Sequence, residues 1–270
     1  HIWKSVFGDS EAFIEEFLNR MQEEDTILLY CVEGKPVSMA CFLPITIKGP
    51  DSETDSDARY VYAVATLPEY RNRGFIRKLL AFAEKEFHQP LVLSPAEPDL
   101  YAYYEKLGFR KLYTDETEVT MIEPARTAEE AEDAACVSNQ KLTPSEYKKL
   151  RDSLFTEPGT FQWNEKSVDF IYYYYGSEET HAVSLTSKDG EEELLMYRQE
   201  EDSLKILENT LSEEELQAVL TQPAMYKALG LTGQIKQTSQ YHPGLMIWDA
   251  DETTYFLTEG HGYFNFSLGD

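Results

Sequence analysis

The chain has 270 residues, of which 42% are hydrophobic and 13% aromatic, which is enough to build the core of one large domain or of two smaller ones. Its 24 basic and 49 acidic residues give a formal net charge of −25. A surface this acidic disfavours nucleic acid and anionic membranes as partners. It can attract a cationic small molecule or a basic peptide, although solubility alone also explains it. No apolar run approaches the about 18 residues that span a bilayer.

Helical and strand patterns alternate along the first part of the chain. Apolar residues at helical spacing predict two helices within 2–24, with a break near 8–10. In chain order, the elements predicted next are a hairpin around 33–36, an acidic loop at 51–58, a strand at 59–67, a helix at 76–87, a strand at 90–94, a helix at 100–108 and two strands within 109–123. This order predicts a mixed α/β sheet with helical crossovers.

A polar stretch rich in Ala and Glu at 125–135 marks the predicted domain boundary, which gives domains of 1–124 and 125–270. The second domain again mixes helices and strands. Helix starts are predicted where Thr143 precedes Glu146, and Ser212 precedes Glu215, at capping-box spacing. Strands are predicted at 181–187, 192–199 and 203–211, with β-rich aromatic runs from 244 onward.

The cysteines and histidines show no pattern of a reactive or metal site. Cys31, Cys41 and Cys136 form no CxxC pair, and the first two lie in apolar runs. We interpret them as buried free thiols of a protein in a reducing cytoplasm. The five histidines are scattered and never paired at i,i+4, so the sequence predicts no metal site.

The segment 60–80 is predicted to be a strand, a turn and a helix, and its turn concentrates positive charge around Gly74. A helix start exposes unpaired N–H groups, and glycine lets a ligand approach the backbone closely. Arg71 and Arg73 add positive charge in the same turn. An anionic ligand, most simply a diphosphate, explains these features together. An ordinary tight turn with solvated arginines explains them equally well.

The phrase "AVATLPEYRNRGFIRKLL" resembles the acetyl-CoA-binding motif of the GNAT acetyltransferase superfamily, R/Q-x-x-G-x-G/A. Arg71 and Gly74 match its first and fourth positions, whereas Ile76 stands where the motif has Gly or Ala. The resemblance implies cofactor-binding roles for two sets of backbone groups. Val64, Ala65 and Thr66 would hold the pantetheine arm, and the amides of Arg71, Asn72, Arg73, Gly74, Phe75 and Ile76 would hold the pyrophosphate.

The later phrase "LVLSPAEPDLYAYYEKLGF" resembles the next strand and helix of the same family, which end in Y-E-K-L-G-F. In many members this Tyr protonates the departing thiolate of CoA, and here it is Tyr104. A phenol with a pKa of about 10 keeps its proton at neutral pH. Packing on the sheet is the alternative role of this ring. Glu69, Glu97 and Asp99 are candidate bases, but none stands out, and an Asn often found early in this helix is absent.

Tandem members of the superfamily carry a second, degenerate GNAT-like domain that lacks the cofactor loop. It ends in a phrase like G-Y-x-N-x-x-L, which 262–268 resembles. In such proteins a short strand precedes the first helix. The chain begins inside an amphipathic pattern without a Met, so we expect native residues, including that strand, ahead of His1. The resemblance implies a mixed GNAT-type sheet flanked by helices, followed by a smaller α/β GNAT-like domain.

The resemblance implies an N-acetyltransferase that moves the acetyl group of acetyl-CoA to a small-molecule or peptide amine. Direct attack in a ternary complex is favoured, because no Cys stands beside a His as an acyl carrier. Two alternatives remain open. One is a non-catalytic acyl-CoA sensor, favoured by Ile76 and the absent Asn; the other is an interaction protein that acts through its second domain. The sequence indicates neither the acceptor nor an oligomeric state.

Overall fold

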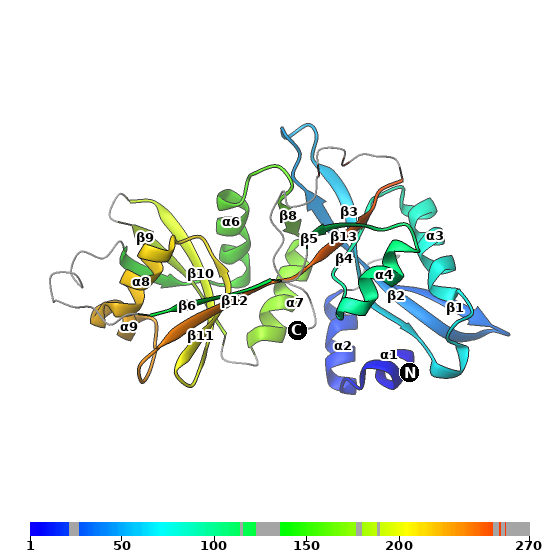
Figure 1. Ribbon diagram of the computed structural model, residues 1–270, viewed down its shortest axis with the longest axis horizontal. Coiled ribbons are helices and arrows are strands. Elements are labelled where there is room, and N and C mark those ends of the chain that lie inside the picture. Colours follow the sequence, from blue (N-terminus) through cyan, green and yellow to red (C-terminus); the bar gives the residue numbers. More distant parts are fainter. Residues whose placement is uncertain are drawn as a thin grey trace. The chain divides into compact units, whose positions relative to one another are not determined.

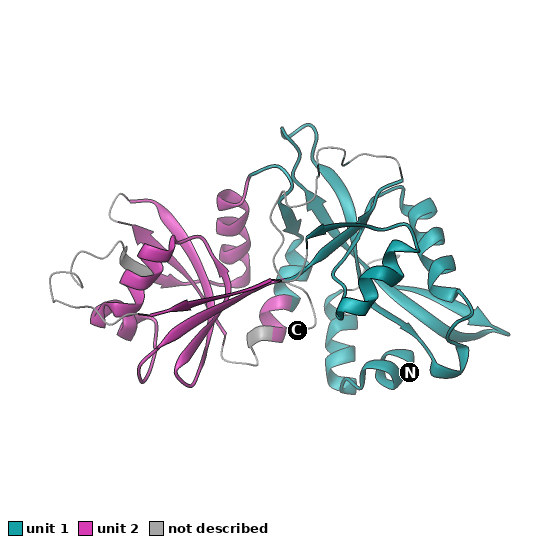
Figure 2. Ribbon diagram, in the orientation of Figure 1, with its two compact units in different colours: residues 1–114, 157–170, 243–270 teal, residues 115–156, 171–242 magenta. Residues whose placement is uncertain are grey.

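The computed structural model describes residues 1–21, 27–113, 116–122, 136–176, 180–187 and 190–250, together with Thr254 and Leu257. They form two compact units, each with its own sheet and helices (Figure 1), which confirms the predicted mixed α/β class. Unit 1 comprises 1–114, 157–170 and 243–270, and unit 2 comprises 115–156 and 171–242 (Figure 2). The division differs from the contiguous one expected at 124/125, because unit 1 takes in two later segments of the chain.

Unit 1 contains one seven-stranded sheet, in which strand order is β1-β2-β3-β4-β13-β5 and β8 pairs with β2. Its strands are β1 (Ile27–Val32), β2 (Lys35–Ile47), β3 (Ser56–Thr66), β4 (Leu91–Leu93), β5 (Arg110–Tyr113), β8 (Phe161–Trp163) and β13 (Leu245–Trp248). Its helices are α1 (Ile2–Phe7), α2 (Glu11–Arg20), the short 3₁₀ helix η1 (Pro68–Tyr70), α3 (Phe75–Phe87), α4 (Pro98–Glu105) and the beginning of α7 (Glu165–Gly176).

The strand pairing corrects one part of the sequence interpretation. Both strands within 109–123 were expected in the first sheet. β5 lies there, but β6 (Glu116–Met121) pairs with β12 (Gln237–His242) in the sheet of unit 2. In unit 1 the position between β4 and β5 is filled by β13, from the end of the chain. Pairing across more than a hundred residues leaves no local sequence signal, because it depends on which buried edges are free.

Unit 2 contains a six-stranded sheet of order β6-β12-β11-β10-β9-β7. Its further strands are β7 (Cys136–Lys141), β9 (His181–Ser187), β10 (Glu192–Glu200) and β11 (Ser203–Asn209). Its helices are α6 (Pro144–Leu154), α8 (Glu213–Thr221) and α9 (Pro223–Ala228). The predicted capping boxes are confirmed at Thr143 with Glu146 and at Ser212 with Glu215, so the local signals of helix starts were sufficient there.

The two sheets repeat one arrangement of strands. In unit 1, antiparallel β1, β2 and β3 are followed by α3 and then by β4, which pairs parallel to β3. In unit 2, antiparallel β9, β10 and β11 are followed by α8 and α9 and then by β12, which pairs parallel to β11. In each sheet the next strand is antiparallel and comes from far along the chain, β13 in unit 1 and β6 in unit 2. α8 therefore holds in unit 2 the place that α3 holds in unit 1.

Helices cover both faces of the sheet in unit 1. On β3, Val61 belongs to a buried group that includes residues of α3 and α4, here called the α3 cluster. Its members are Ala40, Phe42, Val61, Ile76, Leu79, Leu80, Ala83, Leu91, Leu93, Tyr104, Phe109 and Met246. The next residue, Tyr62, instead packs against Trp3 of α1 and Phe17 of α2, with ring centroids 5.7 and 5.6 Å away. Because successive strand residues point to opposite faces, α1 and α2 lie on the face opposite to α3 and α4 (Figure 1).

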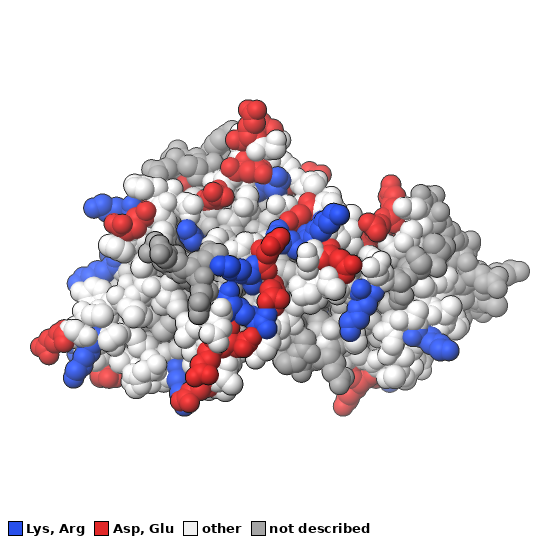
Figure 3. All heavy atoms as spheres, turned by 180° about the vertical axis from the view of Figure 1, so that it is seen from behind, with Lys and Arg blue, Asp and Glu red and all other residues white. Residues whose placement is uncertain are grey.

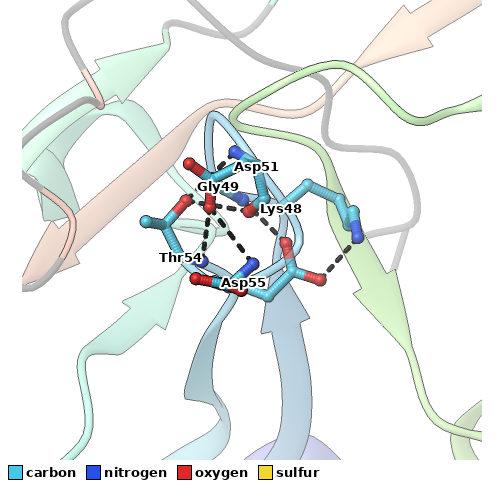
Figure 4. A network of polar contacts seen from close by, with 6 residues as sticks. Lys48, Gly49, Asp51, Thr54 and Asp55 are labelled. Carbon is cyan, nitrogen blue, oxygen red and sulfur yellow. Dashed lines mark hydrogen bonds and ion pairs between the residues drawn. The ribbon is translucent and has the colours of Figure 1, made fainter.

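The acidic loop between β2 and β3 is held by its own side chains (Figure 4). The Asp55 carboxylate accepts a hydrogen bond from the Gly49 amide at 3.0 Å and forms an ion pair with Lys48. Thr54 donates its hydroxyl to the Asp51 carbonyl at 2.8 Å. A Cβ on Gly49 would meet Thr54 at 2.2 Å, so the loop requires glycine there. This loop fixes the entry of β3, the strand that leads to the turn at Gly74.

Candidate functional site

A β-bulge interrupts β3 close to its end. Ala63 has φ of 50°, and the register with β2 shifts so that Ala40 alone stands opposite Ala63 and Val64. The extra residue reverses the alternation of side chains beyond it. Val64 therefore packs against the α3 cluster, on the same face as Val61.

Beyond Tyr60, β3 has an open edge on the side of β4. The two strands pair only at Arg59 with Leu91 and at Tyr60 with Val92, and no other described strand pairs with β3 on that side. The backbone of 64–66, the predicted pantetheine site, lies along this edge. Because strand residues direct their N–H and C=O groups alternately to the two edges, this segment can pair with an extended ligand.

Ser38 holds the end of this strand from the β2 side, and no sequence pattern predicts this contact. Its side chain is fully buried, and its hydroxyl lies 2.9 Å from the Ala65 carbonyl oxygen and 2.8 Å from the Thr66 hydroxyl. A buried hydroxyl that meets two partners holds both in place. Ser38 thus orders the strand end just before the turn.

The turn between η1 and α3 leaves a row of backbone amides without partners. Asn72 and Gly74 adopt the left-handed conformation, with φ of 61° and 73°. The Arg71 amide donates to the Pro68 carbonyl at 3.3 Å, and the first hydrogen bond of α3 runs from the Lys78 amide to Gly74. The amides of 72–77 form no hydrogen bond with any described residue. The available donors thus begin one residue later than predicted, at Asn72.

The start of α3 carries neither of the features that usually satisfy a helix N-terminus. No side chain caps it, and its first turn contains no acidic residue. A Cβ placed on Gly74 meets nothing within 4 Å, so the space beside Gly74 is open. Free amides and the positive end of the helix dipole favour an anion at this position.

Four cations surround this turn, and each is anchored to a neutral acceptor. The hydrogen bonds are from Arg71 to the Thr66 carbonyl at 3.2 Å, from Arg73 to the Glu69 carbonyl at 2.9 Å, from Arg77 to the Lys106 carbonyl at 3.1 Å and from Lys78 to the Tyr30 hydroxyl at 3.1 Å. None of the four forms an ion pair with a described carboxylate.

This lack of carboxylates is unusual for a chain with 49 acidic residues. On the face displayed in Figure 3, basic and acidic side chains lie interspersed. Elsewhere Lys4 pairs with Glu11 and Lys236 with Asp202, both at 2.6 Å. A group of cations left without carboxylates at an open helix start provides a local positive field for a multiply charged anion.

The two residues that follow Gly74 are used for packing. Ile76 is 8% exposed and belongs to the α3 cluster, so its side chain fills the core where the motif has Gly or Ala. Phe75 is also buried and stacks on Tyr30 of β1, with ring centroids 4.4 Å apart. The departure at Ile76 therefore leaves the exposed amides of the turn unobstructed.

Tyr104 lies on α4 within the same cluster as Ile76, and Val64 packs against that cluster. The structure thus brings together residues from all three predicted parts of the site. Tyr104 is 7% exposed, and its ring contacts those of Tyr103 and Phe109. No hydrogen bond joins its hydroxyl to any described residue. Burial, and secondarily the neighbouring Tyr103, raises the pKa of Tyr104 well above its usual value of 10, so the phenol is protonated at neutral pH.

The candidate bases and metal ligands gain no support from the geometry. Glu69, Glu97 and Asp99 are all exposed, and nothing distinguishes one from another. Among the described residues, no group of three or more His, Cys, Asp or Glu side chains could hold a metal ion.

None of the described helices is long and apolar enough to cross a membrane.

The helix at the matching place in unit 2 starts in the opposite way. Ser212 caps α8 by accepting from the Glu215 amide at 3.3 Å, and the Glu215 carboxylate accepts from the Ser212 amide at 2.8 Å. Its first turn consists of Glu213, Glu214 and Glu215. The cap already occupies the Glu215 amide, and the three carboxylates repel an anion from this helix start.

Several solved structures share the fold of the chain at low sequence identity. A conserved protein of unknown function from Enterococcus faecalis V583 shares 13% identity at a TM-score of 0.68, covering 92% of this chain and 69% of that one. A GCN5-related N-acetyltransferase from Kribbella flavida shares 14% identity at 0.63, covering 92% and 68%. One from Anabaena variabilis ATCC 29413 shares 17% at 0.64, covering 96% and 65%.

These structures show a shared fold that extends over both units, and the chain spans about two thirds of their length. No match was found among curated proteins. The model of the acetyltransferase (GNAT) domain matches residues 1–112, which contain β3, the turn at Gly74, α3 and Tyr104. Over its first 112 residues the chain is therefore similar to the GNAT acetyltransferase domain family.

Proposed function

We propose that the protein is an N-acyltransferase that transfers the acetyl group of acetyl-CoA to an amine. One observation carries the proposal: within a strongly acidic chain, the amides of 72–77 and the four cations of 71–78 have no carboxylate partner among the described residues. A diphosphate supplies the charge and the acceptors that this arrangement needs. The GNAT domain match over 1–112 supports acyl transfer as the reaction class.

The open edge of β3 gives the rest of the donor a place. The pantetheine arm carries amide groups, so it can pair with the backbone of 64–66 as an added strand. The bulge at Ala63 and the early end of the β3–β4 pairing make this edge available. The thioester would then lie between β3 and the α3 cluster that contains Tyr104.

The chemistry follows from these positions. The acceptor attacks as a neutral amine, and its nitrogen forms a C–N bond with the acetyl carbonyl carbon. A backbone N–H at the β3 edge can stabilise the carbonyl oxygen as it gains negative charge. The nitrogen passes its extra proton to water, the carbonyl re-forms as the C–S bond breaks, and Tyr104 donates its proton to the departing sulfur and regains one from solvent. We propose no protein base, because water can accept the proton of the amine.

The second unit is proposed to be a degenerate GNAT-like domain. Its strands repeat the arrangement of unit 1, while the capped and acidic start of α8 removes the anion site. Acetyl-CoA would therefore bind once per chain, in unit 1. The acidic residues of the chain favour a cationic small-molecule or peptide amine as acceptor. The thiols of Cys31 and Cys41 are both free, and this supports a reducing cytoplasm, but only Cys41 is buried as expected, because Cys31 is exposed.

The experiment is a titration with acetyl-CoA in a calorimeter, combined with a thiol-release assay over a panel of primary amines. Saturable binding at one site per chain, with release of CoA on at least one amine, is the expected result. Binding without turnover on any amine would favour the alternative, a non-catalytic acyl-CoA sensor. Absence of binding would contradict both.

A further inference from the structure

Lys78 lies at the end of a small aromatic surface that no proposed step has yet used. This surface, here called the Tyr30 platform, consists of Tyr30, Phe75 and Lys78. The Tyr30 and Phe75 rings stack with an interplanar angle of 18°. The Lys78 ammonium lies 5.2 Å from the centroid of Tyr30 and 5.7 Å from that of Phe75, and it bonds the Tyr30 hydroxyl at 3.1 Å.

Several other lysines of the chain have a carboxylate partner: Lys4 with Glu11, Lys48 with Asp55, Lys148 with Asp152 and Lys236 with Asp202. Lys78 is exposed and contacts a phenol and two rings instead, and it forms no ion pair with a described carboxylate. Its charge is therefore positioned but not neutralised.

The direction of the hydrogen bond between Lys78 and Tyr30 leaves further donors of both side chains available. An ammonium group has only donors, so the Tyr30 oxygen accepts from Lys78. The Tyr30 O–H proton has no described acceptor and is free to donate. The remaining N–H groups of Lys78 are free as well. The pair thus presents two kinds of donor and a positive charge, which together suit a phosphate monoester.

The platform is connected directly to the turn. Phe75 follows Gly74, and the Lys78 amide donates the first hydrogen bond of α3 to Gly74. Lys78 therefore lies four residues, or about 6 Å along the helix axis, beyond Gly74, at the far end of the amides proposed to hold the diphosphate. Coenzyme A carries a third phosphate on the ribose, close to its diphosphate.

We propose that Lys78, held in place by Tyr30, binds the 3′-phosphate of coenzyme A, at a subsite separate from the turn that holds the diphosphate. This inference rests on the proposed function. It makes Lys78 and Tyr30 determinants of donor specificity, which select acetyl-CoA over the same thioester without the 3′-phosphate.

The test measures binding of acetyl-CoA and of 3′-dephospho-acetyl-CoA by calorimetry, to the whole chain and to its variants. The unsubstituted protein should bind acetyl-CoA roughly 10- to 100-fold more tightly, the range expected for hydrogen bonds to a charged group. Lys78→Met should abolish most of this ratio by weakening acetyl-CoA binding alone. Tyr30→Phe keeps the ring stacked on Phe75 but removes the hydroxyl, and should reduce the ratio by a smaller factor.

Lys85→Met is the matched control, because Lys85 is an exposed lysine of the same helix, in its last turn. It removes the same charge and should leave the ratio between the two ligands unchanged. If Lys78→Met weakened both ligands equally, Lys78 would serve the diphosphate or the general field, and the inference would be wrong. Equal affinity of the unsubstituted protein for both ligands would also overturn it, with the proposed function intact. Failure to bind either ligand would overturn both.

Discussion

At the scale of single residues, the environment rather than the residue type gives Tyr104 its place in the proposed reaction. Tyr103 and Tyr104 are neighbours in the sequence, yet Tyr103 is 41% exposed and Tyr104 is 7% exposed. Burial raises the pKa of the Tyr104 phenol above its usual value, so that its proton stays in place at neutral pH. In the proposed reaction the phenol gives up this proton only to the sulfur, as the C–S bond breaks.

Replacing Tyr104 with Phe should therefore remove the proton donor and keep the packing of the ring. We expect kcat to fall about 100-fold or more, the range for loss of a general acid, while the Kd for acetyl-CoA changes less than about two-fold. Steady-state kinetics and calorimetry measure the two effects. Tyr103→Phe is the control, because this neighbouring phenol should be dispensable. Full turnover in Tyr104→Phe would refute the assignment.

The same burial predicts how the reaction responds to alkaline pH. An acid whose pKa is raised keeps its proton to higher pH, so Tyr104 should not cause a decline of kcat below about pH 10. We expect a profile that rises as the amine acceptor loses its proton and then stays level. A declining limb with a midpoint below about pH 9 that disappears in Tyr104→Phe would contradict the raised pKa.

At the scale of elements, two helices that follow matching strands differ in how they begin. α8 has a side-chain cap and three glutamates in its first turn, whereas α3 has neither and begins at Gly74. A few residues that are adjacent in the sequence determine how each helix starts. The anion site proposed for unit 1, and its proposed loss from unit 2, thus depend on how two helices start within one repeated arrangement of strands.

Replacing Gly74 with Ala tests this helix start. The left-handed φ of 73° costs Ala about 1–2 kcal/mol, and the added Cβ projects into the open space before the amides. We expect a lower melting temperature and acetyl-CoA binding at least about ten-fold weaker. Gly233→Ala is the control, because Gly233 has a similar φ of 70° and equally open surroundings. It should cost similar stability and leave acetyl-CoA binding unchanged, and a parallel loss of binding would count against the site.

At the scale of the whole molecule, the two sheets are built from segments that the chain supplies out of order. β13 pairs with both β4 and β5, and Leu245, Met246 and Ile247 are fully buried in unit 1. β8 extends the same sheet along β2. The residues that match the GNAT domain model therefore do not by themselves complete the sheet on which the proposed site depends.

A chain cut after residue 124 should not fold into unit 1. It lacks β13, whose three buried side chains contribute roughly 5–9 kcal/mol, which is comparable to the whole stability of a typical domain. We expect a fragment of 1–124 to show little cooperative thermal unfolding in circular dichroism and no acetyl-CoA binding. Cooperative unfolding of this fragment would show that β13 is dispensable.

Much of the local structure followed from the sequence alone. The helix starts at Thr143 and Ser212, the hairpin near Gly34 and the strand–turn–helix around Gly74 all depend on residues within a few positions of each other. The GNAT motif marked the turn because it too is local. The hairpin turn is shorter than expected, since Val32 already pairs with Lys35.

Only the tertiary structure decided which strands meet and which groups stay free. The exchange of β6 and β13 and the bulge at Ala63 depend on contacts between distant segments. The burial of Tyr104 and the hydrogen bond from Lys78 to the Tyr30 hydroxyl also depend on contacts between distant segments. The sequence by itself determined the elements and the amides of the site, because short-range hydrogen bonding and backbone conformation encode both. Pairing and burial select among many distant partners by total free energy, so the folded chain alone settled them.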